Sequence, residues 1–332
     1  MSIIGIDLGT TNSLAAVYQN GASRLIPNAF GEYLTPSVVS LDEDGTVLVG
    51  KAAKERLITH PERTAAAFKR AMGTGRTFSL AGREFLPEEL SALVLRRLKE
   101  DAEAYLGQPV EEAVVSVPAY FTDSQRAATK RAGKLAGLKV DRLINEPSAA
   151  ALACYDPDQG DAAFLVYDFG GGTLDVSVVD CFENVVNILA VSGDNQLGGN
   201  DLDAAIALLY CQENAIDYNG LDPSARAILL SQAEQCKQTL TTAPMAVMVL
   251  DLHEPHRPEA HRKRRHPLRA HAHPAAKGPA GQRPCSPGAA RRGAGGRQLQ
   301  DAGGAPVSRA PAGPPAAGFR PPGHGGGPGR GP

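Results

Sequence analysis

Two segments of the chain repeat one pattern, and this repeat restricts the possible folds more than any other feature of the sequence. Each segment begins with a short apolar run that ends in aspartate, continues through a turn rich in glycine and threonine, and returns along a second apolar run. The two copies are Ile4–Val17 and Leu165–Val178. Apolar runs on either side of a glycine-rich turn are typical of a β-hairpin. Two hairpins of one design, about 160 residues apart, predict two lobes of related structure.

The turn residues indicate what the two hairpins bind. Glycine lets the backbone approach a ligand closely and leaves its N–H groups free for phosphate oxygens. Asp7 and Asp168 end the first strand of each copy, so the repeat predicts that both carboxylates face one cleft. There they can hold a hydrated Mg²⁺ ion, because Mg²⁺ tends to keep its water ligands. A lone Asp-x-Gly is more often a simple β-turn, but two matched copies favour a clamp on the phosphate chain of a nucleotide.

This phosphate site differs from the P-loop and Rossmann types. The sequence has no GxxxxGK[ST] after a strand and no GxGxxG that opens a helix. Helical and strand patterns alternate along the first 250 residues, which indicates an α/β fold. The predicted strands are 3–8, 14–18, 38–41, 47–49, 113–117, 140–144 and several within 163–189. The predicted helices are 51–59, 61–72, 87–106, 123–136, 147–154, 200–217 and 223–241.

Five stretches of the chain carry a family resemblance. They are Ile4–Ser13 (IGIDLGTTNS), Val115–Phe121 (VSVPAYF), Leu143–Ala151 (LINEPSAAA), Asp168–Asp175 (DFGGGTLD) and Gly193–Asp201 (GDNQLGGND). Over about residues 3–245, the chain resembles the nucleotide-binding domain of the DnaK-type heat-shock chaperone family, closest to its HscC-like branch. The resemblance implies the actin-like ATPase fold, with two lobes around an ATP cleft. It also implies slow ATP hydrolysis that drives opening and closing on unfolded polypeptides.

The resemblance assigns roles to individual residues. The implied catalytic residues are Lys69, Glu146, Asp175 and Thr173, and the residues implied to hold Mg²⁺ through water are Asp7 and Asp168. The residues implied to bind the nucleotide are Gly9, Thr10, Thr11, Asn12, Gly170, Gly171, Gly172, Thr173, Gly198, Gly199, Glu234 and Lys237. Lys69 would position the γ-phosphate and the attacking water, and Glu146 and Asp175 would lie around that water. Phosphoryl transfer is mainly positioning and charge neutralisation, so one cation, one metal and nearby carboxylates suffice. Without the family, Lys69 is most simply a solvated cation, and Glu234 with Lys237 a surface ion pair on a helix.

The family also implies cofactors and partners, and two alternatives stay open. ATP and Mg²⁺ are the implied cofactors, unfolded polypeptides the clients, and J-domain proteins or exchange factors the co-chaperones. The first alternative is a metabolite kinase of the same fold, which matches the Asn-Glu-Pro and Gly-Gly-Gly-Thr-Leu-Asp motifs less well. The second is an inactive fragment that binds a partner protein without turning over ATP. Widely spaced cysteines, an N-terminus unlike a signal peptide and the lack of a long apolar run predict a cytoplasmic protein with reduced thiols and no membrane contact.

The sequence changes character after residue 250. Residues 251–332 carry 14 Lys and Arg against 4 Asp and Glu, and they hold 15 of the 25 prolines. Because so few apolar residues remain to offset the ordering entropy, we expect a disordered basic tail. The predicted organisation is a first ATPase lobe at 1–155, a partial second lobe at 156–250 and the tail at 251–332. A nucleic-acid-binding arm is disfavoured, because no aromatic residue is interleaved with Arg262–Arg265.

The tail composition suggests a GC-rich gene read out of frame. If the codons of Arg292–Ala302 are read from one nucleotide later, they permit Val-Val-Leu-Val-Gly-Gly-Asn-Ser-Lys-Met-Pro, which resembles the adenosine loop of the chaperone family. In the same frame, Pro322–Gly331 permits Pro-Asp-Thr-Val-Val-Ala-Leu-Gly-Ala-Ala, which resembles its hinge helix. We therefore expect a frameshift near 245–262, and a second lobe that is incomplete in the chain as written.

Overall fold

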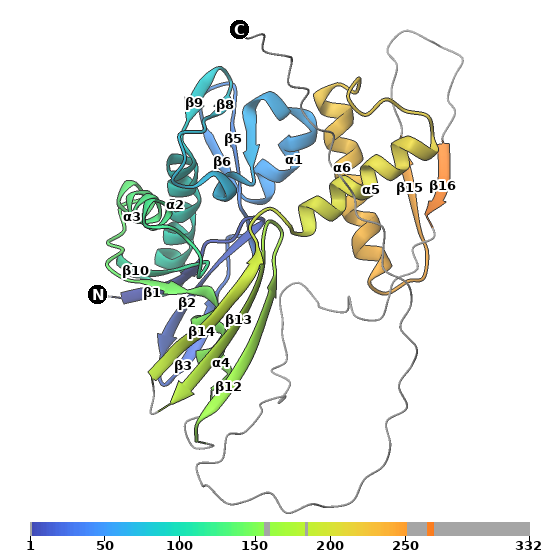
Figure 1. Ribbon diagram of the computed structural model, residues 1–332. Helices are drawn as coiled ribbons and strands as arrows, with labels where there is room; N and C mark the ends of the chain where they lie inside the picture. Colours follow the sequence, from blue (N-terminus) through green and yellow to red (C-terminus); the bar gives the residue numbers. More distant parts are fainter. Residues whose placement is uncertain (1, 156–159, 183–184, 251–263, 269–332) are drawn as a thin grey trace, which may run out of the picture. The chain divides into compact units, whose positions relative to one another are not determined.

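The computed structural model describes residues 2–155, 160–182, 185–250 and 264–268, and its largest sheet has six strands (Figure 1). These strands are β1 (Ser2–Asp7), β2 (Asn12–Gln19), β3 (Ala22–Ile26), β4 (Thr35–Pro36), β10 (Val110–Val117) and β11 (Leu143–Asn145). The order is β11-β10-β1-β2-β3, and β4 pairs with β2. β1 runs parallel to β10 and antiparallel to β2. The carboxyl ends of β1 and β10 therefore lie at the same edge, where Asp7 stands opposite Ser116.

The main hydrophobic core lies between this sheet and two helices, α2 (Pro87–Leu106) and α3 (Asp123–Leu135). α2 begins with Pro87, because proline lacks the N–H group that the first turn of a helix leaves unpaired. It ends at Gly107, whose φ of 65° is the left-handed conformation that glycine adopts without strain. α3 begins with a capping box, in which the Thr122 side chain accepts from the Gln125 N–H. These caps place both helices where the sequence predicts them.

A smaller part of the first lobe contains one error of the sequence prediction. It consists of β5 (Val38–Leu41), β6 (Val47–Val49), α1 (Lys51–Thr59), β8 (Phe78–Leu80), β9 (Arg83–Phe85) and the segment between α1 and β8. The predicted helix 61–72 is wrong, because the segment forms η1 (Pro61–Arg63), β7 (Thr64–Ala66) and η2 (Phe68–Ala71). β7 pairs with β5, and Ala67 takes a left-handed φ of 55° that no α-helix contains. Tertiary pairing thus overrides the helical pattern here.

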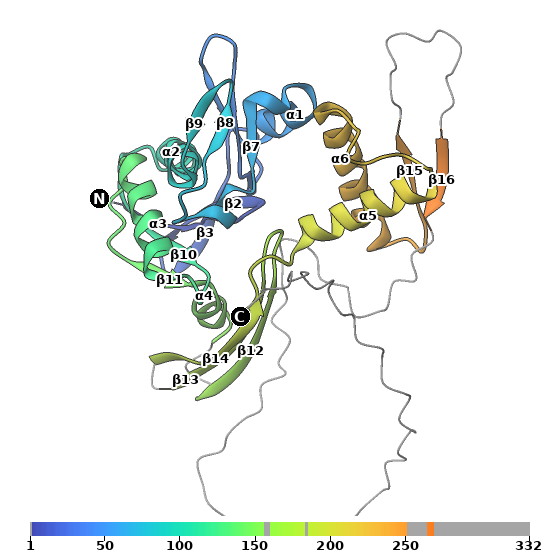
Figure 2. The ribbon, with the colours of Figure 1, turned by 45° about the horizontal axis from the view of Figure 1, so that its top comes forward.

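The second repeat forms an antiparallel sheet of β12 (Ala162–Phe169), β13 (Leu174–Phe182) and β14 (Val185–Asp194), with α4 (Glu146–Cys154) against it (Figure 2). Ala151 of α4 joins Val166, Val179 and Cys181 in a small core on one face of this sheet. The opposite side chains are also apolar but exposed: Leu165 at 72%, Tyr167 at 57%, Phe169 at 38% and Val178 at 36%. We call these four residues the open face. A sheet that normally meets water on one side alternates apolar with polar residues, so this pattern is typical of a sheet covered on both sides.

The last described elements are α5 (Gly199–Glu213), α6 (Pro223–Leu240), β15 (Ala246–Leu250) and β16 (Arg264–Leu268). The two helices and β15 share a core around Tyr210, Leu229 and Met248. β16 pairs antiparallel with β15, which differs from the disorder predicted for this part of the tail. Strand pairing uses backbone groups and can therefore form without an apolar side-chain pattern. The rest of the predicted tail lies outside the described residues.

The cysteines agree only in part with the expectation of reduced thiols. Cys181, Cys211 and Cys236 are buried and free, and burial raises the pKa of each thiol. Cys154 is disulfide-bonded, contrary to the prediction. Within the part of the chain that the structure describes, none of the helices has the length and hydropathy needed to cross a membrane.

Candidate active site

Lys69 and Glu146 form a buried ion pair at the centre of the candidate site. The Lys69 Nζ donates to Glu146 Oε1 at 2.9 Å and lies 5.8 Å from the ring centroid of Phe121. Burial alone would lower the pKa of the Lys69 ammonium, but the negative charges of Glu146, Asp7 and Asp168 outweigh it, so the pKa is raised. Lys69 is therefore a fixed cation, 7% exposed, and not the solvated lysine that the bare sequence suggests.

Asp7 and Asp168, the two aspartates of the repeat, act on this same lysine. Asp7 ends β1 and Asp168 lies near the end of β12. Their negative charges contribute to the raised pKa of Lys69. The pKa of Glu146 is raised as well, mainly because the carboxyl is buried and also because of these two charges, while Lys69 acts to lower it. The Ser116 hydroxyl donates to Asp7 Oδ1 at 2.8 Å. The structure thus brings both aspartates of the repeat to one group of charges.

Asp175 is a second acid of the group whose pKa is raised. It lies on β13, is 3% exposed, and neither of its oxygens has a hydrogen-bond partner among the described residues. Burial, with the Asp168 charge added, raises the pKa of Asp175 to about 6. The Tyr120 hydroxyl also has no partner there, and burial followed by the Asp175 charge raises its pKa to about 12. The Thr173 hydroxyl lies near both groups and lowers both pKa values slightly, without the geometry of a hydrogen bond.

The glycine-rich turns of the two repeats touch each other. A Cβ atom added to Gly171 would lie 1.7 Å from Thr11 Oγ1, and one added to Gly172 would lie 2.7 Å from Thr10 Cγ2. Within the first turn, a Cβ on Gly9 would lie 2.1 Å from the Asn12 carbonyl oxygen. The turns leave no room for larger residues at these glycines. A ligand could lie between the turns only if they moved apart.

A third glycine turn completes the group. The Gly199 N–H donates to the Gly170 carbonyl at 2.9 Å, and the Asn200 N–H donates to the Gly171 carbonyl at 2.9 Å. Lys237 reaches the same turn from α6, donating to the Gly199 carbonyl at 3.0 Å and to Asp203 at 2.8 Å. The turn that begins α5 therefore lies directly against the Gly170–Thr173 turn of the second repeat.

Gly198→Ala is expected to displace this third turn. Its Cβ atom would lie 2.5 Å from Gly171 C and 2.5 Å from Gly172 N, which are backbone atoms that cannot swing aside. We expect a loss of about 1–3 kcal/mol in the free energy of unfolding. Amide hydrogen exchange should also quicken at Gly199 and Asn200. Gly75→Ala is the control, because nothing lies within 4 Å of its added Cβ; equal effects of the two substitutions would contradict the close contact.

Glu234 lies at a different part of the group from Lys237. Its carboxylate pairs with Lys54 Nζ at 2.9 and 3.0 Å, and so joins α6 to α1. It also accepts from the Gln238 side chain at 3.4 Å. Glu234 and Lys237 are therefore engaged with separate partners and do not form the mutual ion pair that their spacing on a helix suggests.

Three residues of the site carry no role in the sequence prediction. Arg70 pairs with Asp201 at the start of α5, and Tyr120 approaches the Asp175 carboxylate. Arg70 directly follows Lys69, and Tyr120 belongs to the VPAYF motif, so both were adjacent to predicted features. Asp201 is the third residue of α5 and accepts from the Gly198 N–H at 2.7 Å. No pattern in the sequence pairs residue 70 with residue 201, because only the tertiary fold brings them together.

The residues present fit a nucleotide phosphate chain with Mg²⁺. Several of the buried polar atoms that lack a hydrogen-bond partner within the described ranges belong to this site: Thr11 Oγ1, Arg70 Nε, the Tyr120 hydroxyl and both Asp175 oxygens. Such atoms cost free energy unless a ligand satisfies them. Hydroxyl and N–H donors suit phosphate oxygens, and carboxylates suit a hydrated divalent cation. Asp7 and Asp168 are the residues placed to hold that cation through water.

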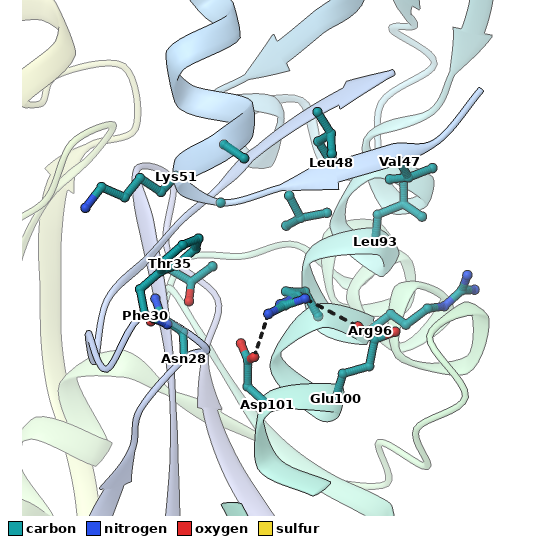
Figure 3. Close-up of a pocket in the computed structure, with 14 residues that line it drawn as sticks. Asn28, Phe30, Thr35, Val47, Leu48, Lys51, Leu93, Arg96, Glu100 and Asp101 are labelled. Carbon is teal, nitrogen blue, oxygen red and sulfur yellow. Dashed lines mark hydrogen bonds and ion pairs between the residues drawn. The ribbon is translucent and has the colours of Figure 1, made fainter. Parts of the chain in front are cut away.

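A separate cavity of about 370 Å³ lies between the 28–35 loop, β6, the start of α1 and α2 (Figure 3). Its most buried acid, Asp101, pairs with Arg97 at 3.0 Å, and burial raises the pKa of Asp101. Lys51, also in the lining, pairs with Glu32. The lining includes none of the residues predicted to bind nucleotide. The first pair lies within α2, and the second joins α1 to the 28–35 loop.

The chain matches the model of a known protein family. The model of the Hsp70 family, described as Hsp70 protein, matches residues 3–79 and 75–257 of the chain. These overlapping segments cover well over half of the sequence and include all three glycine turns and the Lys69–Glu146 pair. The mixed α/β architecture is consistent with the actin-like ATPase domain of that family. The chain belongs to the Hsp70 family, and the matched region is a chaperone nucleotide-binding domain.

Proposed function

We propose that this chain is the ATP-binding and ATP-hydrolysing domain of a chaperone of the HscC-like branch, acting on unfolded polypeptides in the cytoplasm. The observation that carries the proposal is the group of charges around Lys69, with Glu146, Asp7, Asp168 and Asp175 all acting on it. A fixed cation among carboxylates, beside closely packed glycine turns, suits the charge of a transferring phosphoryl group. J-domain proteins and exchange factors are the proposed co-chaperones.

The residues divide into groups with separate tasks. The three turns, with Thr10, Thr11 and Gly170–Thr173, would bind phosphate oxygens. Lys69 would orient the γ-phosphate, and Glu146 with Asp175 would orient the attacking water. Bound Mg²⁺ would neutralise phosphate charge. Asp175, with a pKa of about 6, is half-protonated at about pH 6 and could exchange a proton with that water.

Product analysis distinguishes the proposal from a metabolite kinase of the same fold. With γ-labelled ATP and no added acceptor, a chaperone ATPase releases all label as inorganic phosphate. A kinase leaves the label on ATP until a small hydroxylated acceptor is added. Transfer of label to a sugar or polyol, faster than release as phosphate, would contradict the proposal.

We further propose that the continuation of the second lobe is encoded in another reading frame. The supporting observation is the open face, an apolar sheet surface whose side chains are exposed. The out-of-frame segments are rich in Val, Leu and Ala, which is the composition that such a face requires. Resequencing the gene across codons 240–270 tests this directly. A nucleotide sequence in which the shifted frame does not continue the second lobe would contradict the frameshift.

The chain as written is expected to bind MgATP more weakly than the frame-restored chain, by about tenfold or more, and to hydrolyse it little. Contacts with the base, remote from the reacting atoms, normally contribute to positioning at the γ-phosphate, so losing them should lower both affinity and turnover. Calorimetry and a phosphate-release assay on both chains measure this. Equal affinity and turnover in the two chains would contradict the incomplete lobe.

A further inference from the structure

Arg70 connects the first-lobe turn η2 to the start of α5. Its Nη1 donates to Asp201 Oδ1 at 3.2 Å, and its Nη2 makes a shorter contact with Oδ2. Both oxygens of the carboxylate are thus held by both ends of the guanidinium group. The Asp201 side chain is 35% exposed, so water and ions can reach this pair. By contrast, the side chain of the neighbouring cation, Lys69, which pairs with Glu146, is only 8% exposed.

The third nitrogen of the Arg70 guanidinium group, Nε, lies beside the glycine turns of the two repeats. Arg70 Nε is buried and has no hydrogen-bond partner among the described residues. A Cβ atom added to Gly172 would lie 2.8 Å from Nε and 3.0 Å from Thr10 Oγ1. This N–H group therefore lies where the two turns of the repeat meet, and nothing described there accepts its hydrogen.

A guanidinium group recognises carboxylates and phosphates with the same geometry. Its planar N–H donors match two oxygens of either anion. An ion pair open to water contributes little stability, so a second anion can replace the carboxylate at small cost. A phosphate chain entering between the turns would approach Nε first and then compete with Asp201 for the remaining donors.

We propose that Arg70 is a second phosphate-binding cation beside Lys69, and that Asp201 occupies its guanidinium group until a phosphate chain replaces it. The inference rests on the proposed function, since it concerns the same phosphate site. Arg70 holds the pKa of Asp201 below its ordinary value. The carboxylate is thus a charged competitor at neutral pH.

Two substitutions that remove the same ion pair test the proposal, because they should change phosphate affinity in opposite directions. The probe is inorganic tripolyphosphate with Mg²⁺, titrated into the full chain by calorimetry. Arg70→Ala is expected to weaken binding about tenfold or more, since charge-assisted hydrogen bonds are lost. Asp201→Asn frees the guanidinium group and is expected to tighten binding several-fold. Arg70→Lys keeps the charge but not the planar donors, so it should fall between wild type and Arg70→Ala.

Arg76→Ala is the matched control, because Arg76 is an exposed arginine whose guanidinium lies 5.2 Å from the Phe78 ring centroid. It should leave tripolyphosphate affinity unchanged. Thermal unfolding without ligand reports how much the ion pair stabilises the fold. Arg70→Ala and Asp201→Asn should lower the unfolding temperature by similar amounts, because each removes the pair. Equal weakening of tripolyphosphate binding by those two variants would overturn the proposal and show that the ion pair has only a structural role. Absence of binding by the folded wild-type chain would also overturn it. ATP that binds through Arg70 in the frame-restored chain without being hydrolysed would instead contradict the proposed function alone.

Discussion

Lys69→Ala in the frame-restored chain is expected to lower the rate of ATP hydrolysis by at least about 100-fold. Lys69 is a buried cation held 2.9 Å from Glu146 by a hydrogen bond, so its charge is aimed and little screened by water. Its removal takes away stabilisation of the charge that develops during phosphoryl transfer. ATP should still bind within a few-fold of wild type, because backbone N–H groups and Mg²⁺ supply most phosphate affinity. Single-turnover phosphate release and equilibrium ATP titration measure the two effects separately.

The control for this substitution is Lys139→Ala, which removes a lysine from a surface pair with Asp141. It should leave turnover unchanged. Lys69→Ala also strands the buried Glu146 carboxylate, which costs about 3–5 kcal/mol when a buried pair is broken. Thermal unfolding of each variant at the assay pH therefore accompanies the kinetics. A folded Lys69→Ala variant with wild-type turnover would show that the ammonium has only a structural role.

Asp175→Asn is expected to stabilise the ligand-free protein at pH 8, by up to about 3 kcal/mol. The carboxyl has a pKa of about 6 in the folded chain, against 3.8 for an ordinary aspartate. Between these two pH values the unfolded chain loses its proton while the folded chain keeps it. Stability therefore falls as the pH rises through this window, and the cost stays constant above it. Asparagine has the same shape and avoids this cost.

The measurement is the free energy of unfolding of wild type and Asp175→Asn from pH 4 to pH 8, without nucleotide or Mg²⁺. The two curves should meet near pH 4 and separate as the pH rises. Asp180→Asn, on the same strand, is the control for removing a carboxylate. Parallel curves for wild type and Asp175→Asn would mean that the Asp175 carboxylate is already satisfied in the folded chain. The gain in stability should come with loss of ATP turnover, as expected when a strained charge serves function.

Local signals in the sequence predicted much of the fold. The bounds of α1, β5 and β6 agree with the predicted ranges, and α2 runs from Pro87 to Leu106 because its terminal Pro and Gly have position-specific preferences. The segment 61–72 failed for the opposite reason. Its alanines and terminal proline favour a helix locally, but Thr64–Ala66 gain backbone hydrogen bonds from β5. The tendency of 64–66 to form a strand depends on the partner strand β5 and cannot be found in the sequence of the segment itself.

The site was predicted unevenly for the same physical reason. The glycine turns and their aspartates are visible because close backbone approach demands glycine within one short motif. The pairing of Lys69 with Glu146 required the family resemblance, since 77 residues separate them. Arg70 and Asp201 were missed because each has an ordinary local explanation, as a surface cation and as the third residue of a helix. The carboxylate of Asp175 could be named, but its raised pKa depends on burial that only the folded lobe supplies.

The open face has a consequence for how this protein meets other proteins. Chaperones bind polypeptides that expose apolar residues on extended strands, and Leu165, Tyr167, Phe169 and Val178 present that kind of surface on one face of the β12–β13 pair. The chain therefore carries, on its own nucleotide-binding domain, the kind of exposed apolar surface that chaperones bind in their clients. In a cell, chaperones of its own family would bind this surface, and such quality control would determine how long the protein persists.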